Sequence, residues 1–283
     1  MSDPIATAFG PFGRIGVMDM DAPLAIHVHH HLHIILKVGG SNTGFAVKGR
    51  LYPATHSTAI LINRWEPHAW SPVPGQAPTR FLTLYLEPEW LRDMGLGNGL
   101  DSFGRFFPSP IADRSDWANC ITDHLHDLIL SSTQSIHPVS ITGDLSGLLV
   151  DLVQALQKGT LRSLSPEGRR FAYDYRIRRA MHLLYSSNAP TQLDEVAEEV
   201  GLSRPHFFDL FKKCTGVTPN RVSNAIRMER AITLLTQSSD PMADLAEDLH
   251  FATPGNFSRF FKSQIGINPN AFRRTMIADG LHR

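Results

Sequence analysis

The 283-residue chain has little cysteine and no long apolar run. Its two cysteines, Cys120 and Cys214, fall in different predicted domains, which excludes a disulfide framework and suits a reducing compartment. The first residues, MSDPIATAFG, lack the basic and apolar regions of a secretory signal, and no apolar stretch is long enough to span a bilayer. The sequence therefore predicts a soluble cytoplasmic protein with no membrane partner.

The chain also lacks an excess of charge of either sign. Lys and Arg number 27, as do Asp and Glu, so no overall basicity indicates a nucleic-acid partner. Division of the chain after Ser165 reveals a modest asymmetry, because the N-terminal part holds 11 basic and 14 acidic residues and the remainder holds 16 and 13. With so small a surplus of basic residues, one protomer would contact few DNA phosphates. We therefore expect that useful affinity for DNA needs a dimer.

Two versions of one thirty-residue unit occupy residues 193–222 and 242–272. The first reads LDEVAEEVGLSRPHFFDLFKKCTGVTPNRV and the second MADLAEDLHFATPGNFSRFFKSQIGINPNAF, and their aromatic, Lys and Pro-Asn positions correspond at offsets of 49 or 50 residues. Two copies are too few for a solenoid, which needs three or more repeats. The repeat indicates a paired binding module.

Each unit has the pattern of a helix, a tight turn and a second helix. Apolar residues at i, i+3, i+4 and i+7 predict both helices. Gly201 supplies the positive φ that the first turn needs, and His250 replaces it in the second unit, where histidine tolerates the left-handed region. Ser203 and Thr253 are predicted to cap the second helices. This arrangement is typical of a helix-turn-helix that reads DNA.

A further helix is predicted between the two units, from Pro219 to about Gln237. At 1.5 Å per residue it would be ~30 Å long, close to the ~34 Å that separates successive major grooves on one face of DNA. It could hold two recognition helices one turn of DNA apart.

Residues 174–274 resemble the DNA-binding domain of the AraC/XylS family of transcription regulators. The resemblance includes the connecting segment IRMERAITLL and the closing segment FSRFFKSQIGINPNAFRR. It implies that double-stranded DNA is a partner, that residues 204–214 and 254–264 are the base-contacting helices, and that the regulator is an activator.

The candidate DNA contacts are the polar and outward residues of these two helices. Asp209 departs from the basic or polar residue that the family commonly carries, although an Asp can accept a hydrogen bond from cytosine. We expect Arg259 to contact bases, and Lys212 and Lys262 to contact phosphate. The full set is Arg204, Pro205, His206, Phe208, Asp209, Lys212, Lys213, Gly255, Asn256, Ser258, Arg259 and Lys262.

The N-terminal part predicts short β-strands followed by a helical hairpin. Strand-like runs broken by turn residues continue to about residue 110, and a leucine stripe from Leu145 to Leu156 predicts a helix that either covers the barrel or pairs with a second protomer. We expect a homodimer through this stripe, and a folded monomer when Leu149 and Leu152 are replaced by Lys. The layout resembles the cupin-like sensor half of many AraC/XylS regulators.

The predicted fold class is therefore α+β, with three parts. Residues 1–157 form a cupin-like β barrel with a helical hairpin that binds an effector and dimerises. Residues 158–168 form a linker, and residues 169–283 form an all-α domain with two helix-turn-helix units.

Histidine is concentrated in the segment LAIHVHHHLHIILKV. On one strand, His27, His29, His31 and His33 would share a face. Cupins carry an H-x-H-x3–4-E element and a later Pro/His element, which here corresponds to Pro67-His68, but His33 stands where a cupin metal site offers Glu.

Three readings of this cluster follow, namely a Zn²⁺ or Fe²⁺ site, the polar wall of a pocket for an organic effector, and a polar strand face that is simply solvated. We expect the second, with no metal or other cofactor, and with effector contacts from His27, His29, His33, His68 and Trp70. No paired carboxylates or nucleophile–base motif supports catalysis, so the protein is predicted not to be an enzyme. The alternatives are a metal-dependent cupin enzyme or metal sensor fused to a DNA-binding module, and a purely architectural DNA binder.

Overall fold

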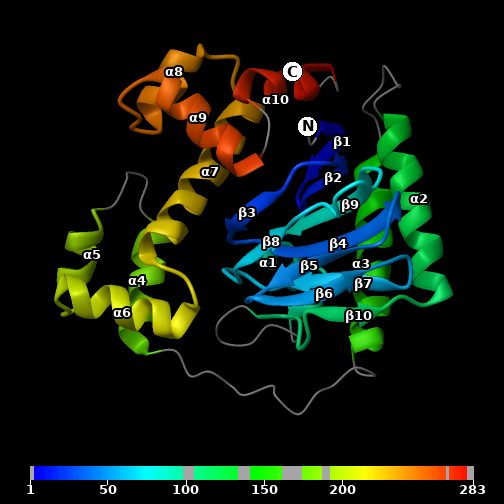
Figure 1. Ribbon diagram of the computed structural model, residues 1–283, viewed down its shortest axis with the longest axis horizontal. Coiled ribbons are helices and arrows are strands. Elements are labelled where there is room, and N and C mark those ends of the chain that lie inside the picture. The colour runs from blue at the N-terminus through cyan, green and yellow to red at the C-terminus, as the bar shows by residue number, and fades with distance from the viewer. Residues whose placement is uncertain are drawn as a thin grey trace.

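The computed structural model describes residues 3–97, 105–132, 141–160, 174–186, 192–265 and 268–278. Strands fill the N-terminal part and helices fill the C-terminal part, so the predicted α+β class is confirmed (Figure 1). None of the helices in these ranges is long and apolar enough to cross a membrane.

In the described residues, ten antiparallel strands form two sheets. The larger sheet has the order β1 (Asp3–Gly10), β2 (Gly13–Met20), β9 (Thr79–Leu86), β4 (Leu32–Gly39), β7 (Thr58–Ile62) and β10 (Ile111–Asp113). The smaller has the order β3 (Leu24–His27), β8 (His68–Trp70), β5 (Thr43–Val47) and β6 (Arg50–Ala54).

The larger sheet is buried on both faces. Along β4, Ile34 and Leu36 pack with the leucines of the helical hairpin, whereas Ile35 packs between the two sheets with Phe45 and Phe81. Side chains alternate along a strand, so His33 lies on the same side as Ile35, toward the interior of the barrel.

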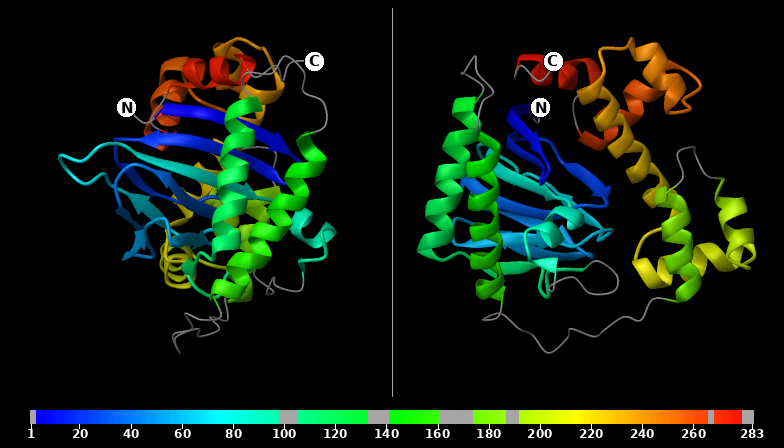
Figure 2. Two further views of the ribbon diagram at one scale, coloured as in Figure 1. Left: turned by 90° about the vertical axis from the view of Figure 1, so that its right-hand side faces the viewer. Right: turned by 180° about the vertical axis from the view of Figure 1, so that it is seen from behind.

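The helical hairpin covers the outer face of the larger sheet. Its helices are α2 (Asp116–Ser132) and α3 (Ile141–Thr160), and they lie side by side along the sheet in both views of Figure 2. A single turn of helix, α1 (Pro88–Asp93), follows β9. Leu149 and Leu152 are fully buried in the core that α3 shares with the sheet. Of the two roles considered for the leucine stripe, the structure shows that it covers the barrel within one chain.

Two expectations about this hairpin are therefore corrected. The leucine stripe is not a free seam, so lysines at Leu149 and Leu152 should unfold the domain instead of releasing a folded monomer. Helix α3 also continues to Thr160, three residues past the predicted end of the domain. The remainder of the predicted linker, residues 161–168, lies outside the described residues.

Seven helices make up the described C-terminal part. They are α4 (Tyr175–Ser186), α5 (Leu193–Glu199), α6 (Arg204–Thr215), α7 (Pro219–Gln237), α8 (Met242–Asp248), α9 (Pro254–Ile265) and α10 (Pro269–Ala278). Phe207 and Phe211 fill the core of the first helix-turn-helix unit, and Phe257 and Phe261 fill that of the second. Helix α7 contributes to both cores, so it fixes the two units relative to each other.

The predicted turns and caps are confirmed with one exception. Gly201 has φ 69° and His250 has φ 55°, so histidine does adopt the left-handed conformation at the second turn. The backbone N–H of Asn256 donates to Thr253 Oγ1 at 3.1 Å, which caps α9. Ser203 occupies the cap position of α6, but its side chain makes no capping hydrogen bond.

Helix α7 also lies against the barrel, on the side opposite the helical hairpin (Figures 1 and 2). Val28, from the barrel, packs into the core of the first helix-turn-helix unit, and Phe9 packs against that of the second. The two parts of the chain are therefore in contact through apolar side chains at the cores of both helix-turn-helix units.

Candidate functional site

The histidine-rich segment does not form one strand. Strand β3 ends at His27 and β4 begins at Leu32, and these strands belong to different sheets. The chain must cross between the sheets over residues 28–31. The prediction of one shared face is therefore wrong for His31, which turns away from the other histidines toward Glu87 and Glu229.

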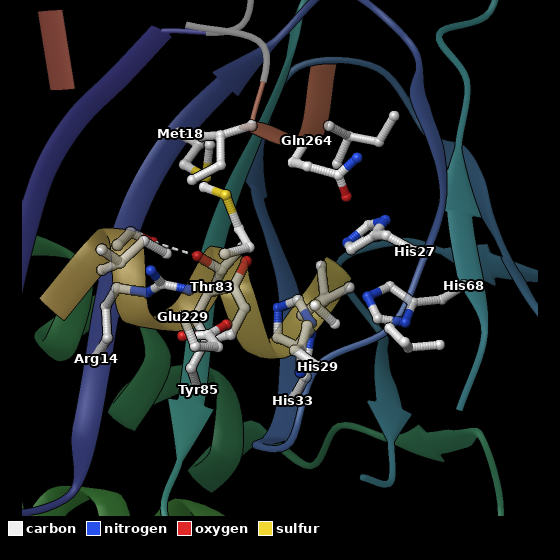
Figure 3. A pocket seen from close by; sticks show the side chains of 18 of the residues that line it. Arg14, Met18, His27, His29, His33, His68, Thr83, Tyr85, Glu229 and Gln264 are labelled. Carbon is white, nitrogen blue, oxygen red and sulfur yellow. Dashed lines mark hydrogen bonds between the residues drawn. The ribbon is translucent and has the colours of Figure 1, made fainter. Parts of the chain in front are cut away.

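Four histidines do converge in one pocket. His27, His29 and His33 meet His68 of β8, as the labelled side chains in Figure 3 show. Ring centroids lie 4.1 Å apart for His27 and His68, 4.8 Å for His29 and His68, and 4.9 Å for His29 and His33. The Nε2 of His29 is 3.1 Å from Nδ1 of His33.

Hydrogen bonds fix the tautomers of two of these rings. The Nδ1–H of His68 donates to the carbonyl of Glu66 at 2.8 Å, and that of His27 donates to the carbonyl of Ala25 at 2.9 Å. The Nε2 atom of each ring therefore keeps its lone pair when the ring is neutral. Nδ1 of His29, Nε2 of His33 and Nε2 of His68 have no partner within the described part of the chain. These atoms are open to a ligand.

The barrel histidines are neutral at physiological pH. Burial, followed by the charge that the neighbouring imidazoles would carry, holds the pKa values of His29, His33 and His68 well below their ordinary range. A neutral imidazole can both donate and accept a hydrogen bond, and it can also ligate a metal ion.

The opposite wall of the pocket carries charge. The guanidinium carbon of Arg14 lies 3.9 Å from the ring centroid of Tyr85, and Glu229 reaches in from α7 (Figure 3). Burial alone would raise the pKa of Glu229, but His31 and Arg14 hold it below its ordinary value, so the carboxylate is ionised. Apolar side chains complete the walls, namely Met18, Met20, Leu24, Ile35, Met228, Ile232, Ile265 and Phe272.

Trp70 does not line this pocket, contrary to expectation. It is buried in the core between the two sheets, and its indole N–H donates to Thr43 Oγ1 at 3.2 Å. Arg14 and Glu229 also line the pocket, and neither is among the residues predicted from the sequence. No pattern marks Arg14, and the sequence places Glu229 only on a helix that separates two DNA-binding units.

Three of the four barrel histidines also have the composition of a metal site. One ligand atom from each of His27, His29 and His68 lies within 4.8 Å of the others. Two interpretations, a metal site and a polar wall for an organic ligand, therefore apply to the same place in the barrel.

Most of the candidate DNA contacts are exposed on α6 and α9. Arg204, Pro205, His206, Asp209, Lys212, Lys213, Gly255, Arg259 and Lys262 are exposed, and Phe208, Asn256 and Ser258 are partly buried. Phe208 packs beside Phe207, under the guanidinium of Arg204, which also forms an ion pair with Asp194. The guanidinium of Arg259 donates to Asn256 Oδ1.

Comparisons with known proteins cover both parts of the chain. A family model described as a helix-turn-helix domain matches residues 196–275, and one described as an AraC-like ligand binding domain matches residues 18–160, slightly more than half of the chain. The Msm operon regulatory protein of Streptococcus mutans is 24% identical over 140 residues, which are 50% of this chain and 49% of that protein. The lactose operon transcription activator of Staphylococcus xylosus is 31% identical over 81 residues, 29% of each chain.

The fold of the whole chain also has a solved counterpart. ToxT of Vibrio cholerae, solved with an unsaturated fatty acid bound, superimposes with a TM-score of 0.58 at 14% identity, over 95% of each chain. The chain spans about half the length of the first curated relatives that match it. With a ligand-binding domain of the AraC type joined to a pair of helix-turn-helix units, the chain belongs to the AraC family of transcription regulators.

Proposed function

We propose that this protein is a sequence-specific DNA-binding regulator of transcription, not an enzyme, and that a small organic molecule controls it through the pocket described above. One observation carries the proposal. The pocket has walls from both parts of the chain, because α7 supplies Ala225, Met228, Glu229 and Ile232. A ligand in it touches the helix that holds the two helix-turn-helix units together.

The size of the pocket suggests how a ligand exerts control. Its volume is about 90 Å³, less than the ~150 Å³ cavity that accommodates benzene in another protein. An open cavity of about 610 Å³ adjoins it, and the two share Arg14, Glu229 and Ile232. A larger effector must therefore extend into the open cavity or move α7 away from the barrel. In either case the effector binds one arrangement of the two domains more tightly than another. This difference in affinity is what allows a ligand to shift the protein between the two arrangements.

The lining defines the class of effector. Neutral histidines and Arg14 suit hydroxyl or carboxylate oxygens, and the methionine, isoleucine and phenylalanine side chains suit an apolar body. A bare metal ion would use only the histidines and would leave these apolar walls unexplained. The four barrel histidines also include no carboxylate among them to balance the charge of an ion. The unsaturated fatty acid held by ToxT has the amphiphilic character that we propose for this effector.

A matched panel of ligands tests the effector site. Thermal unfolding of the full chain would be followed with aliphatic and aromatic carboxylic acids and with the corresponding alcohols and hydrocarbons. We expect an acid or alcohol to raise the midpoint and the hydrocarbon to do so less. His29→Ala and His68→Ala should each abolish the difference in midpoint shift between the acid or alcohol and the hydrocarbon. His206→Ala, at an exposed position on α6, should retain that difference. A shift that persists in both pocket variants would locate the effector elsewhere.

Arg259 is proposed as a principal base contact. A bidentate Arg–guanine pair gives about 1–3 kcal/mol of discrimination, so Arg259→Ala should weaken binding to a selected site by roughly 5- to 150-fold and relax preference at one position. Lys262→Ala should weaken binding to specific and random duplexes alike and flatten the salt dependence, as expected of a phosphate contact. Fluorescence anisotropy with both duplexes measures these effects, and wild-type affinities for Arg259→Ala would show that another face of α9 meets the bases.

We propose three further features. A homodimer would supply phosphate contacts beyond those of one chain, and sedimentation at micromolar concentration decides whether it forms. Activation is proposed because the matching relative from Staphylococcus xylosus is an activator. A cytoplasmic location follows from chromosomal DNA as the target.

A further inference from the structure

The break in the histidine segment creates a second cluster outside the effector pocket. His30 and His31 leave the barrel interior and face Glu87, which lies between β9 and α1, and Glu229 of α7. Both imidazoles are at least nine-tenths buried, and Nδ1 of each has no hydrogen-bond partner in the described part of the structure. The effector site and the DNA-binding surface leave His30 and His31 without a role.

The two nitrogens of His31 face different carboxylates. Nε2 of His31 is 3.0 Å and Nε2 of His30 is 3.4 Å from the same Oε1 atom of Glu87, so Glu87 holds both rings by their Nε2 side. The unpartnered Nδ1 of His31 lies 3.7 Å from Oε1 of Glu229, and one ligand atom from each of His30, His31 and Glu229 lies within 4.8 Å of the others. Ligands that each lie 2.0–2.1 Å from a tetrahedral metal are about 3.3 Å apart, so these three side chains suit one shared ion, with Glu87 fixing the orientation of the two rings.

The charge balance differs from that of the barrel cluster. Two imidazoles and one carboxylate form a set that binds Zn²⁺ and other divalent first-row transition metals, and Glu87 beside the imidazoles adds a second negative charge that compensates the charge of the ion. Arg14, beside Glu229, and Arg64, which donates to the carbonyl of His30 at 2.8 Å, are the cationic neighbours. The open cavity of about 610 Å³ is lined by His31, Glu87 and Glu229, which gives an ion a route from solvent.

We propose that His30 and His31 of the barrel, held in place by Glu87, together with Glu229 of α7, bind a divalent transition metal ion that fastens the barrel to the DNA-binding domain. Two ligands come from one domain and one comes from the other. The ion therefore binds most tightly to the arrangement in which the two domains touch, and it stabilises that arrangement in proportion to this preference. The site shares Glu229 with the effector pocket and none of that pocket's four histidines.

The test uses Zn²⁺ and Co²⁺ with the untagged full chain after removal of metals by a chelator. Competition with a chromogenic chelator gives the zinc affinity, and the visible absorption of Co²⁺ reports the coordination geometry. The variant His30→Ala/His31→Ala removes two proposed ligands. Its matched control, His27→Ala/His68→Ala, removes two histidines of the barrel pocket. Thermal unfolding without metal checks that each variant is folded. If His30→Ala/His31→Ala is not folded, Glu87→Gln takes its place.

We expect one tightly bound zinc ion in the wild-type chain. The His30→Ala/His31→Ala variant should lose at least about 10–100-fold in affinity, since disturbance of supporting groups alone costs that much, whereas the barrel control should keep the wild-type affinity and the Co²⁺ spectrum. Zinc should also slow hydrogen exchange in α7 of the wild-type chain, and Glu229→Gln should abolish this protection. Absence of zinc binding, unchanged binding in His30→Ala/His31→Ala, or a loss confined to the barrel control would each overturn the proposal. All three outcomes leave the organic effector to be tested separately.

Discussion

Lysine at both Leu149 and Leu152 is expected to unfold the N-terminal domain. Both side chains belong to α3 and are fully buried in the core between α3 and the larger sheet. Loss of each buried leucine removes about 1.5–3 kcal/mol of hydrophobic stabilisation. Each lysine also destabilises the folded domain by several kcal/mol, because it places an unpaired charge in the core. The sum is comparable to the 5–15 kcal/mol by which a typical domain is stable.

Circular dichroism and urea denaturation measure this effect. Gln154→Lys is the matched control, because Gln154 is exposed on the same helix, and it should keep the wild-type midpoint. A double variant that stays folded with a wild-type midpoint, and that sediments as a monomer where the wild-type chain is a dimer, would restore the leucine stripe as an interface between protomers.

Acidification is expected to destabilise the protein steeply below about pH 6.5. Burial depresses the folded-state pKa values of His29, His33 and His68, whereas in the unfolded chain these groups titrate near 6.5. Below that pH the unfolded chain binds more protons than the folded one. The contribution to stability is therefore complete above about pH 6.5 and is lost as the pH falls toward the folded-state values. The three histidines together lower the free energy of unfolding by up to about 4 kcal/mol for each pH unit of acidification.

Urea denaturation at pH 7.5 and pH 5.5, with a chelator present, tests this dependence. His68→Gln retains a donor for the carbonyl of Glu66 and should remove about one third of the slope. His206→Gln, at an exposed position, should leave the slope unchanged. Equal free energies of unfolding at the two pH values would mean that the barrel histidines are protonated or hydrated in the folded protein.

The C-terminal fold could be predicted from the sequence because its signals are local. Apolar spacing, a glycine or histidine at each turn, and a proline at the start of each second helix determine the two units independently of the remainder of the chain. The position of Phe208 could not be predicted with the same ease. Its packing under Arg204 depends on the ion pair that Arg204 forms with Asp194 on the neighbouring helix.

The N-terminal pocket could be predicted only in part. His27, His29, His33 and His68 do meet, because alternation along β4 and pairing of β3 with β8 direct them to one interior. The crossing between sheets at residues 28–31 has no glycine or proline to mark it, so His31 was assigned to the wrong face. Its position depends on which sheet each strand joins, and that depends on contacts distant in sequence. The role of Glu229 likewise depends on how α7 docks on the barrel.

Selection of bound sites from random duplexes by the full chain tests the central claim most directly. Two helix-turn-helix units on the rigid helix α7 predict an enriched motif with two parts about one helical turn apart, and Arg259→Ala should lose preference within one part only. An effector identified by the ligand panel should change the affinity for that motif, and His29→Ala/His68→Ala should remove the change. Failure to enrich any motif, or an enriched motif whose affinity never responds to a ligand bound in the pocket, would contradict the account.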